Sequence, residues 1–336
     1  MKIGIGLIVR NEAINIVSCL EQFTWADYIC IVDTGSNDDT DVIAHLWYAK
    51  HRRNLVLSYH HAKEQVSELI DGQWLIRDFS KARNIYLDYL DDKVDYVYAA
   101  SVGAILDQPE KMKEVVKSGH EVYTFNVKRG GATFIHHRLW KTKLGIRYKG
   151  AVHECANING KTMAPSGITV THESGNTSTQ EPSNKRNLRI LEGEYKKRPG
   201  TRTLFYYAMA LKDSKDYKGA VKIYREYLAM GGNAYHDERM FAWIYLVRCL
   251  RKFDPQAALQ AGYKALGEDQ RFSEIPMEMS YIYCEQRQYK KALAMAILAH
   301  QPPPKSDLFV EPSRYKQEPI KMIDFVQNIK AVRSTP

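Results

Sequence analysis

Apolar runs and helical patterns alternate over the first hundred residues of this 336-residue chain. Buried-strand patterns occupy residues 2–9, 28–33, 54–59 and 94–100, and helical patterns occupy residues 11–20, about 40–50, and 79–90. Clusters of Gly, Ser, Asn and Asp separate these segments, as turns require. Strands that alternate with helices predict an α/β fold with a mostly parallel sheet and flanking helices, which binds ligands beyond the carboxyl ends of its strands.

Further along the chain the pattern changes from strands to repeated helices. Strand patterns cover residues 120–127, 133–140 and 146–153, and helical patterns begin near residue 184. Ala220, Ala258 and Ala292 recur in similar surroundings at spacings of 38 and 34 residues, close to the tetratricopeptide period of about 34. The repeat predicts three helical hairpins that stack as a short solenoid, and an irregular helical bundle is the alternative.

The length and composition allow two hydrophobic cores. A chain of 336 residues with 44% apolar residues is long for one domain. We therefore expect an α/β domain over residues 1–183, an all-α helical-repeat domain over 184–300, and a proline-containing tail with a short helix over 301–336.

Cysteine usage and apolar runs bear on the compartment. The five cysteines are widely spaced and form no C-x-x-C pair, which favours a reducing compartment over a disulfide framework or a zinc knuckle. No secretion signal is recognisable, and no apolar stretch approaches the ~20 residues of a membrane span. We expect a soluble, cytoplasmic protein without a membrane partner.

The formal net charge of +9 has two interpretations. Basic surfaces attract nucleic acid or acidic ligands, but many soluble proteins carry such a surplus without a polyanionic partner. Residues 185–202 hold the densest group of cations. This stretch predicts either a docking patch or a solvated helix face.

Two neighbouring strand ends carry polar residues suited to a nucleotide. Asp33 precedes Thr-Gly-Ser, and its carboxylate can accept a hydrogen bond from a pyrimidine N3–H or a ribose hydroxyl, while Gly35 permits a tight turn. Arg10, Asn11 and Glu12 end the neighbouring strand, where they would share the pocket. The alternative is an ordinary strand-to-helix turn.

Two further features near these strand ends bear on phosphate binding. Lys81 and Arg83 lie within one turn near the start of a predicted helix, which suits diphosphate oxygens. Gly4 and Gly6 do not form a dinucleotide-binding motif, because the third glycine of that motif is absent. We expect these two glycines to serve close packing.

Four segments, in this order and followed by tetratricopeptide-like repeats, resemble family-2 glycosyltransferases of the GT-A fold. They read IVRNEA, VDTGSNDDT, DFSKARN and, over residues 138–154, RLWKTKLGIRYKGAVHE. The resemblance implies transfer of a sugar from a nucleotide donor, usually UDP-linked, with inversion at the anomeric carbon. It places donor-binding positions on Arg10, Glu12, Asp33, Ser36, Lys81, Arg83, Asn84 and Ser101, and acceptor-side positions on His153 and Glu154.

The sequence departs from this family at the metal site. The family's Asp-x-Asp would fall on Ser101 and Gly103, which offer no carboxylate for Mg²⁺ or Mn²⁺. Three interpretations stay open. Catalysis is metal-free, with cations from Lys81, Arg83, Lys149 or His153; or a metal is held elsewhere by Asp107 and His153; or the chain is a binding-only relative.

An inverting transfer also needs a general base for the acceptor's proton. Glu154 is the first candidate, because it ends a strand-like segment that should face the pocket, and Glu173 is the second. A structural role for Glu154 is the alternative. His136, His137 and His172 are interpreted as packing or loop histidines.

The sequence therefore predicts a glycosyltransferase that moves a sugar from a nucleotide donor to a macromolecular acceptor. The helical repeats favour a polypeptide acceptor, and the basic balance keeps a modified DNA base open. The rival from another class is a non-catalytic nucleotide-sugar-binding or scaffold protein that has lost the acid pair.

Overall fold

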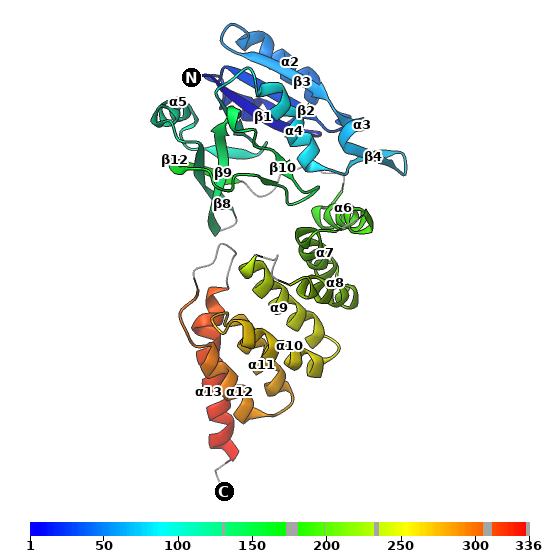
Figure 1. Cartoon of the computed structure of the whole chain (residues 1–336), viewed down its shortest axis with the longest axis vertical. Helices are drawn as coiled ribbons and strands as arrows, with labels where there is room; N and C mark the ends of the chain where they lie inside the picture. The colour runs from blue at the N-terminus through cyan, green and yellow to red at the C-terminus, as the bar shows by residue number, and fades with distance from the viewer. Residues whose placement is uncertain (130–131, 173–180, 198, 232–234, 305–310, 334–336) are drawn as a thin grey trace. The chain divides into compact units, whose positions relative to one another are not determined.

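The computed structural model of the chain describes residues 1–129, 132–172, 181–197, 199–231, 235–304 and 311–333 (Figure 1). It forms two compact units, Met1–Arg186 and Asn187–Pro336. Within the described residues, no helix is both long and apolar enough to span a bilayer.

The first unit is built on one eight-stranded sheet with the order β3-β2-β1-β6-β9-β8-β12-β7. Its strands are β1 (Ile3–Val9), β2 (Tyr28–Asp33), β3 (Val56–His61), β6 (Tyr96–Ala99), β7 (Ala104–Leu106), β8 (Val122–Arg129), β9 (Ala132–Lys141) and β12 (Met163–His172). Strands β3, β2, β1 and β6 are parallel to one another, and β8 is parallel to β12. The pairs β6/β9, β9/β8 and β12/β7 are antiparallel. The predicted mostly parallel sheet is confirmed.

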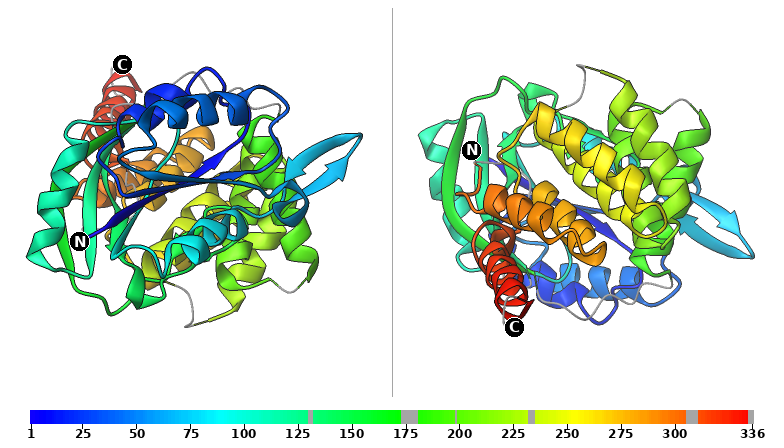
Figure 2. Two further views of the ribbon diagram at one scale, coloured as in Figure 1. Left: turned by 90° about the horizontal axis from the view of Figure 1, so that it is seen from above. Right: turned by 90° about the horizontal axis from the view of Figure 1, so that it is seen from below.

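Helices cover both faces of the parallel part of the sheet (Figure 2, left). They are α1 (Ile16–Glu21) and α2 (Thr40–His51) on one face, and α4 (Phe79–Leu90) on the other. Short helices α3 (Lys63–Val66) and α5 (Met112–Val115) and the 3₁₀ turns η1 (Pro109–Lys111), η2 (Val116–Ser118) and η3 (Thr142–Leu144) complete this unit.

The two glycines of β1 allow α4 to lie directly against the sheet. A Cβ atom on Gly6 would stand 2.2 Å from Cδ2 of Tyr86, and one on Gly4 would stand 2.9 Å from Cδ2 of Leu90. Real Cβ atoms do not approach so closely, so the predicted close-packing role is confirmed.

The structure differs from the sequence prediction in three segments. Helix α1 begins at Ile16 rather than at Asn11, because Asn11 adopts φ 54° and residues 11–15 form a turn. The strand expected over 146–153 is reduced to β10 (Tyr148–Lys149), which pairs with β11 (Cys155–Ala156). The chain leaves β10 through a bend in which His153 adopts φ 53°.

A hairpin of β4 (Ser67–Ile70) and β5 (Gln73–Ile76) is the third difference. Its turn is Asp71-Gly72, with φ angles of 48° and 77°. Two positive φ angles are typical of the type I′ turn that Asp-Gly favours between strands. The signal for this hairpin was therefore present in the sequence, although the prediction did not include it.

The second unit consists of helical hairpins. Helix α6 (Ser183–Lys197) leads into it, and the hairpins are α7/α8 (Thr201–Asp213, Tyr217–Ala229), α9/α10 (His236–Arg251, Pro255–Glu268) and α11/α12 (Glu274–Glu285, Tyr289–Ala299). The repeated Ala220, Ala258 and Ala292 lie fully buried on the second helix of each hairpin. The predicted repeat is confirmed.

The C-terminal segment packs on this helical unit. The 3₁₀ turn η4 (Pro312–Tyr315) precedes α13 (Gln317–Arg333), a helix of 17 residues that packs against α12. Val326 of α13 is fully buried in the core of the unit. This last helix is longer than the short one that was expected.

Three cations of the basic stretch over 185–202 are paired with carboxylates near them in the structure. Lys196 and Lys197 lie 2.7 Å from Glu192 and Glu194, and Arg202 lies 3.4 Å from Glu238. Pairing of these cations favours the solvated helix face over the docking patch.

Candidate functional site

Three neighbouring parallel strands end at one edge of the sheet. Strand β1 ends at Val9, which lies opposite Asp33 at the end of β2, and β6 ends at Ala99, which lies opposite Gly6 of β1. The chain passes from β1 to β2 on one side, whereas β6 lies on the other side of β1. Such a reversal opens a crevice beyond the carboxyl ends of the strands, where α/β proteins bind ligands.

The carboxylate of Asp33 orders the turn that follows β2. Its Oδ1 accepts hydrogen bonds from the backbone N–H of Gly35 at 2.9 Å and of Ser36 at 2.7 Å. Its Oδ2 accepts one from the hydroxyl of Tyr59 at 2.8 Å. Burial, and then the charge of Asp33, raise the pKa of Tyr59 well above its usual range. Asp33 is itself buried, so it shapes the turn while lying directly at the strand end.

The turn after β1 is locked to the turn after β2. The backbone N–H of Asn11 donates to Oγ of Ser36 at 2.9 Å, and the N–H of Asn37 donates to Oδ1 of Asn11 at 2.8 Å. The N–H of Glu12 donates to Oγ1 of Thr40 at 2.8 Å. These bonds explain why residues 11–15 form a turn instead of extending α1.

Arg10 and Glu12 project from this turn with different partners. An Nη2 proton of Arg10 is donated to the carbonyl of Trp74 in the β4–β5 hairpin. Glu12 accepts a hydrogen bond from Nδ2 of Asn15 at 2.9 Å. Burial is the main cause that raises the pKa of Glu12, and the nearby charge of Asp38 adds to it. Arg10 therefore connects the strand end to the hairpin.

A cleft of about 150 Å³ opens between these elements. It is lined by Ile8, Val9, Arg10, Glu12, Thr34, Ile76, Phe79, Glu181 and Arg186. The Arg186 guanidinium lies 5.0 Å from the centre of the Phe79 ring. Whole-ligand pockets measure about 300–1,000 Å³, so this cleft has room for one flat part of a ligand, such as a base.

Helix α4 carries the predicted phosphate-binding cations in different directions. Asp78 caps the helix by accepting the backbone N–H of Lys81 at 2.9 Å, and the Lys81 side chain is exposed. Arg83 turns inward and donates from Nε to Oε1 of Glu154 at 2.6 Å. Its guanidinium also lies 5.1 Å from the centre of the Tyr148 ring. The two cations therefore do not form a single clamp.

The loop that carries His153 and Glu154 is fixed to α4. Nδ2 of Asn84 donates to the carbonyl of Tyr148 at 3.1 Å, and its Oδ1 accepts the N–H of Tyr148 at 2.9 Å. The left-handed conformation of His153 then turns Glu154 back toward Arg83. Asn84 thus holds the loop, and a contact of Asn84 with the donor stays a prediction.

Glu154 is held on one oxygen only. In the described part of the chain, no hydrogen bond to Oε2 accompanies the 2.6 Å bond that Arg83 makes to Oε1. The side chain is 14% exposed. Glu154 is therefore oriented by Arg83 and keeps an oxygen for a proton. Glu173, the second candidate base, lies outside the described residues.

The guanidinium of Arg138 lies at the end of β6, where glycosyltransferases of the resembled family carry a metal-binding acid pair. Nη1 of Arg138, on β9, donates to the carbonyl of Ala99 at 3.2 Å and to Oγ of Ser101 at 3.3 Å. Its Nη2 lies 3.1 Å from Nε2 of His172. A positive charge and a neutral hydroxyl are not ligands for a hard divalent cation. The residues present at this strand end do not fit Mg²⁺ or Mn²⁺.

Asp107 does not supply the missing carboxylate. Its Oδ1 accepts the backbone N–H of Thr169 at 3.0 Å, and its own N–H donates to the carbonyl of Thr169 at 3.1 Å. Asp107 therefore joins β7 to β12. Across the residues that the structure describes, no group of three or more His, Cys, Asp and Glu side chains is arranged to hold a metal.

The sequence interpretation missed Arg138, and it treated His136 and His172 beside it as packing or loop histidines. Burial first, and then the charge of Arg138, lower the pKa of His136 to about 4, so this imidazole is neutral at physiological pH. His172 contacts Arg138 directly. Arg138 stood inside a segment that carried the family resemblance, but a single arginine in a strand pattern gives no signal of where it points.

Comparison with known proteins gives weak similarities. No protein-family profile matches the chain, and no curated protein matches it. Among solved structures, the mannosyltransferase PcManGT from Pyrobaculum calidifontis in complex with GDP-Man and Mn²⁺ superimposes with a TM-score of 0.40 at 14% identity, over 88% of this chain and 86% of that one. A MamA protein gives 0.35 at 14% identity, over 44% and 73%. A mycobacterial protein gives 0.37 at 13% identity, over 56% and 71%.

Proposed function

We propose that the chain is an inverting glycosyltransferase that moves a sugar from a nucleotide donor, UDP-linked by the sequence resemblance, to a macromolecular acceptor. The observation that carries the proposal is the crevice where β1, β2 and β6 end together. It combines a partly apolar cleft, a turn ordered by Asp33 and guanidinium groups from Arg10 and Arg83. These are the groups that a base, a ribose and a diphosphate require.

The proposed arrangement gives each group one task. The base enters the cleft between Thr34 and Phe79, and the turn of Asp33 to Ser36 faces the ribose. Oε2 of Glu154 takes the proton of the acceptor hydroxyl, and the oxygen of that hydroxyl attacks the anomeric carbon. The bond from the anomeric carbon to the diphosphate breaks with its electron pair on the leaving oxygen, and the configuration inverts.

The acceptor is assigned to the class of macromolecules on the strength of the helical unit. Stacked helical hairpins present extended surfaces that bind polypeptides in many proteins. A modified base in DNA is the alternative that the net charge of +9 keeps open. Dependence of acceptor binding on salt distinguishes them, because each phosphate contact steepens the loss of affinity with salt.

A nucleotide-sugar panel tests the proposal. UDP- and GDP-linked hexoses are incubated with the full chain, with and without EDTA, and donor cleavage is followed. Release of free nucleoside diphosphate that persists in EDTA is the expected result. Glu154→Gln should abolish release while nucleotide binding, measured by calorimetry, is retained. Binding without cleavage of any donor would identify a non-catalytic module, and no binding at all would remove the assignment.

A further inference from the structure

Arg138 is a buried cation that has no counter-ion among the described residues. Its side chain is buried, with 8% of the residue exposed. In the described part of the chain, its polar partners are a carbonyl, a hydroxyl and an imidazole nitrogen, and no carboxylate pairs with it. Taking a charge out of water costs several kcal/mol unless an opposite charge compensates it. Among the described residues, the position of the Arg138 guanidinium therefore lacks an anion.

A β-bulge places Arg138 at this position. In the pairing of β8 with β9, Leu139 lies opposite Tyr123 and His137 lies opposite Thr124, so Arg138 is an extra residue with no partner of its own. A bulge of this kind changes the direction of a side chain, and bulges are frequent beside active sites. The irregular register thus sends the guanidinium over the end of β6, toward Ser101.

Part of the hydrogen-bonding capacity of Arg138 is unused. Nε is buried and has no hydrogen-bond partner among the described residues. Tyr98 lies on β6 beside it, and its buried hydroxyl is likewise unpartnered. The charge of Arg138 acts on the pKa of Tyr98, so the two groups are neighbours, and the unused N–H of the guanidinium can donate to an oxygen of an anion.

We propose that Arg138 binds the diphosphate of the nucleotide donor and neutralises the charge that develops on it during transfer. The inference rests on the proposed function and assigns this task to a residue of the chain in place of a divalent ion. The N–H donors of Arg138 are held in position by the fold, so they can stabilise the diphosphate charge without first being reoriented, as solvent water would have to be. Ser101 supports it by accepting one of its hydrogen bonds.

The test compares ligands that differ by one phosphate. Affinities of UDP and UMP, of GDP and GMP, and of inorganic pyrophosphate are measured by calorimetry in EDTA for the wild type and for Arg138→Met. Loss of a charge-assisted hydrogen bond should weaken diphosphate and pyrophosphate binding about ten- to a hundredfold and leave the monophosphates almost unchanged. Arg147→Met is the matched control, because Arg147 pairs with Asp88 and Asp91 on the outer side of α4.

Two further variants keep the test decisive. Arg138→Lys retains the charge without the planar fork and should recover only part of the preference for diphosphates. Arg138→Met combined with Ser101→Asp and Gly103→Asp should bind diphosphates better with Mn²⁺ than in EDTA. An unchanged ratio of UDP to UMP affinity in Arg138→Met would overturn the inference alone. If the wild type binds neither nucleotides nor pyrophosphate, the proposed function and the inference both fail.

Discussion

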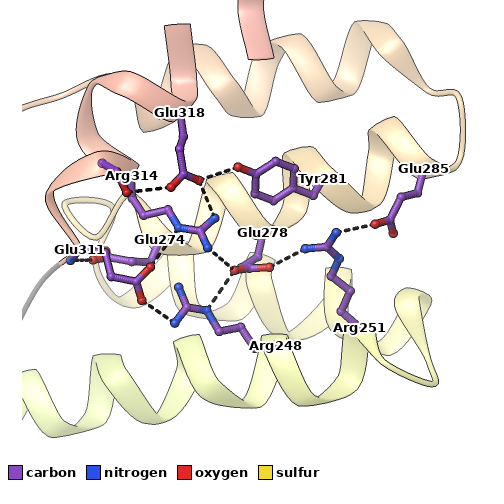
Figure 3. Close-up of polar contacts among 10 residues, drawn as sticks. Arg248, Arg251, Glu274, Glu278, Tyr281, Glu285, Glu311, Arg314 and Glu318 are labelled. Carbon is purple, nitrogen blue, oxygen red and sulfur yellow. Dashed lines mark hydrogen bonds and ion pairs between the residues drawn. The ribbon is translucent and has the colours of Figure 1, made fainter. Parts of the chain in front are cut away.

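Buried Arg138 of the α/β unit and the partly buried arginines around Glu278 of the helical unit have different kinds of partner. In the α/β unit, Arg138 has only neutral partners among the described residues. In the helical unit, Arg248, Arg251 and Arg314 surround one carboxylate, that of Glu278, which is 4% exposed (Figure 3). Removing one partner of a buried pair leaves an uncompensated charge and is costly, whereas a charge without a counter-ion is available to a ligand.

The ion pairs and hydrogen bonds around Glu278 and Glu274 connect the C-terminal segment to the helical repeats. Arg248 of α9 donates to Glu278 of α11 at 2.9 Å and to Glu311 at 2.6 Å. The hydroxyl of Tyr315 in η4 donates to buried Glu274 of α11 at 2.7 Å. The bonds of Arg248, drawn in Figure 3, join elements that lie far apart in the sequence, and the bond of Tyr315 does the same. The network therefore has a structural role.

The largest expected effect comes from breaking this network at its centre. Glu278→Ala leaves three guanidinium groups facing one another without the carboxylate that compensates them. Breaking a buried pair in this way costs about 3–5 kcal/mol. Hydrogen exchange with mass spectrometry should show that loss in the free energy of opening of α9 and α11, with little change in β1 or β2.

A control lies on the same helix. Glu285 accepts a hydrogen bond from Arg251, but its side chain is 57% exposed. Exposed pairs contribute about 0–1 kcal/mol, so Glu285→Ala should have an effect within that range. Equal losses for the two variants would show that burial does not distinguish these two carboxylates.

The second effect concerns a carboxylate of the α/β unit. Asp33→Ala removes the acceptor of the Gly35 and Ser36 N–H groups and of the Tyr59 hydroxyl. Leaving such donors unsatisfied costs about 1–3 kcal/mol, and the turn that faces the ribose loses its order. Calorimetry with UDP should show weaker binding by a similar amount. Equal affinity in wild type and variant would separate Asp33 from the nucleotide site.

Much of the fold was predictable because local periodicity and tertiary structure agree. Helix α4 covers the predicted residues 79–90, since its Asp78 cap and apolar spacing both specify that span. The ends of β1 and β2 were located for the same reason. The three buried alanines of the repeat lie where one helix packs closely against another, so the spacing of these alanines in the sequence predicts the helical hairpins.

The parts that could not be predicted depend on contacts between distant segments. The direction of Arg138 is set by a one-residue slip between β8 and β9, which no pattern within β9 records. The pairing of Arg83 with Glu154 joins residues 71 apart, through a bend with a left-handed His153. Sequence motifs placed these residues near the site, but their partners follow from the tertiary fold.

A third prediction compares the two kinds of arginine directly. Arg138→Met removes an uncompensated buried charge, so the free energy of unfolding of the α/β unit should stay the same or rise by up to about 2 kcal/mol. Arg248→Met removes a cation that two carboxylates need and should lower the stability of the helical unit. Hydrogen exchange in each unit measures both. A strong loss of stability in Arg138→Met would mean that the arginine is structural.

The smallest effects should appear in the pH dependence of two carboxyl groups with opposite shifts. Burial alone would raise the pKa of Glu311, but hydrogen bonds and charges of Arg248 and Arg314 lower it below its usual 4.5. Its contribution to stability is therefore present above pH 4.5 and lost as the pH falls through the lower folded-state value. Burial raises the pKa of Glu12 above 4.5, so its contribution is present below pH 4.5 and lost as the pH rises.

Glutamine variants isolate these two contributions. At pH 7, Glu311→Gln should be less stable than the wild type and Glu12→Gln should be equally or more stable. As the pH falls, the Glu12 difference should shrink before pH 4.5 is reached and the Glu311 difference should shrink below pH 4.5, because the wild-type carboxyls become neutral like the amides that replace them. Hydrogen exchange at pH 7 and pH 4 reports each unit separately. A deficit of Glu311→Gln that persists unchanged at the lower pH would show that shape rather than charge holds Glu311 in the network, and the contrast between paired and unpaired arginines would lose its electrostatic basis.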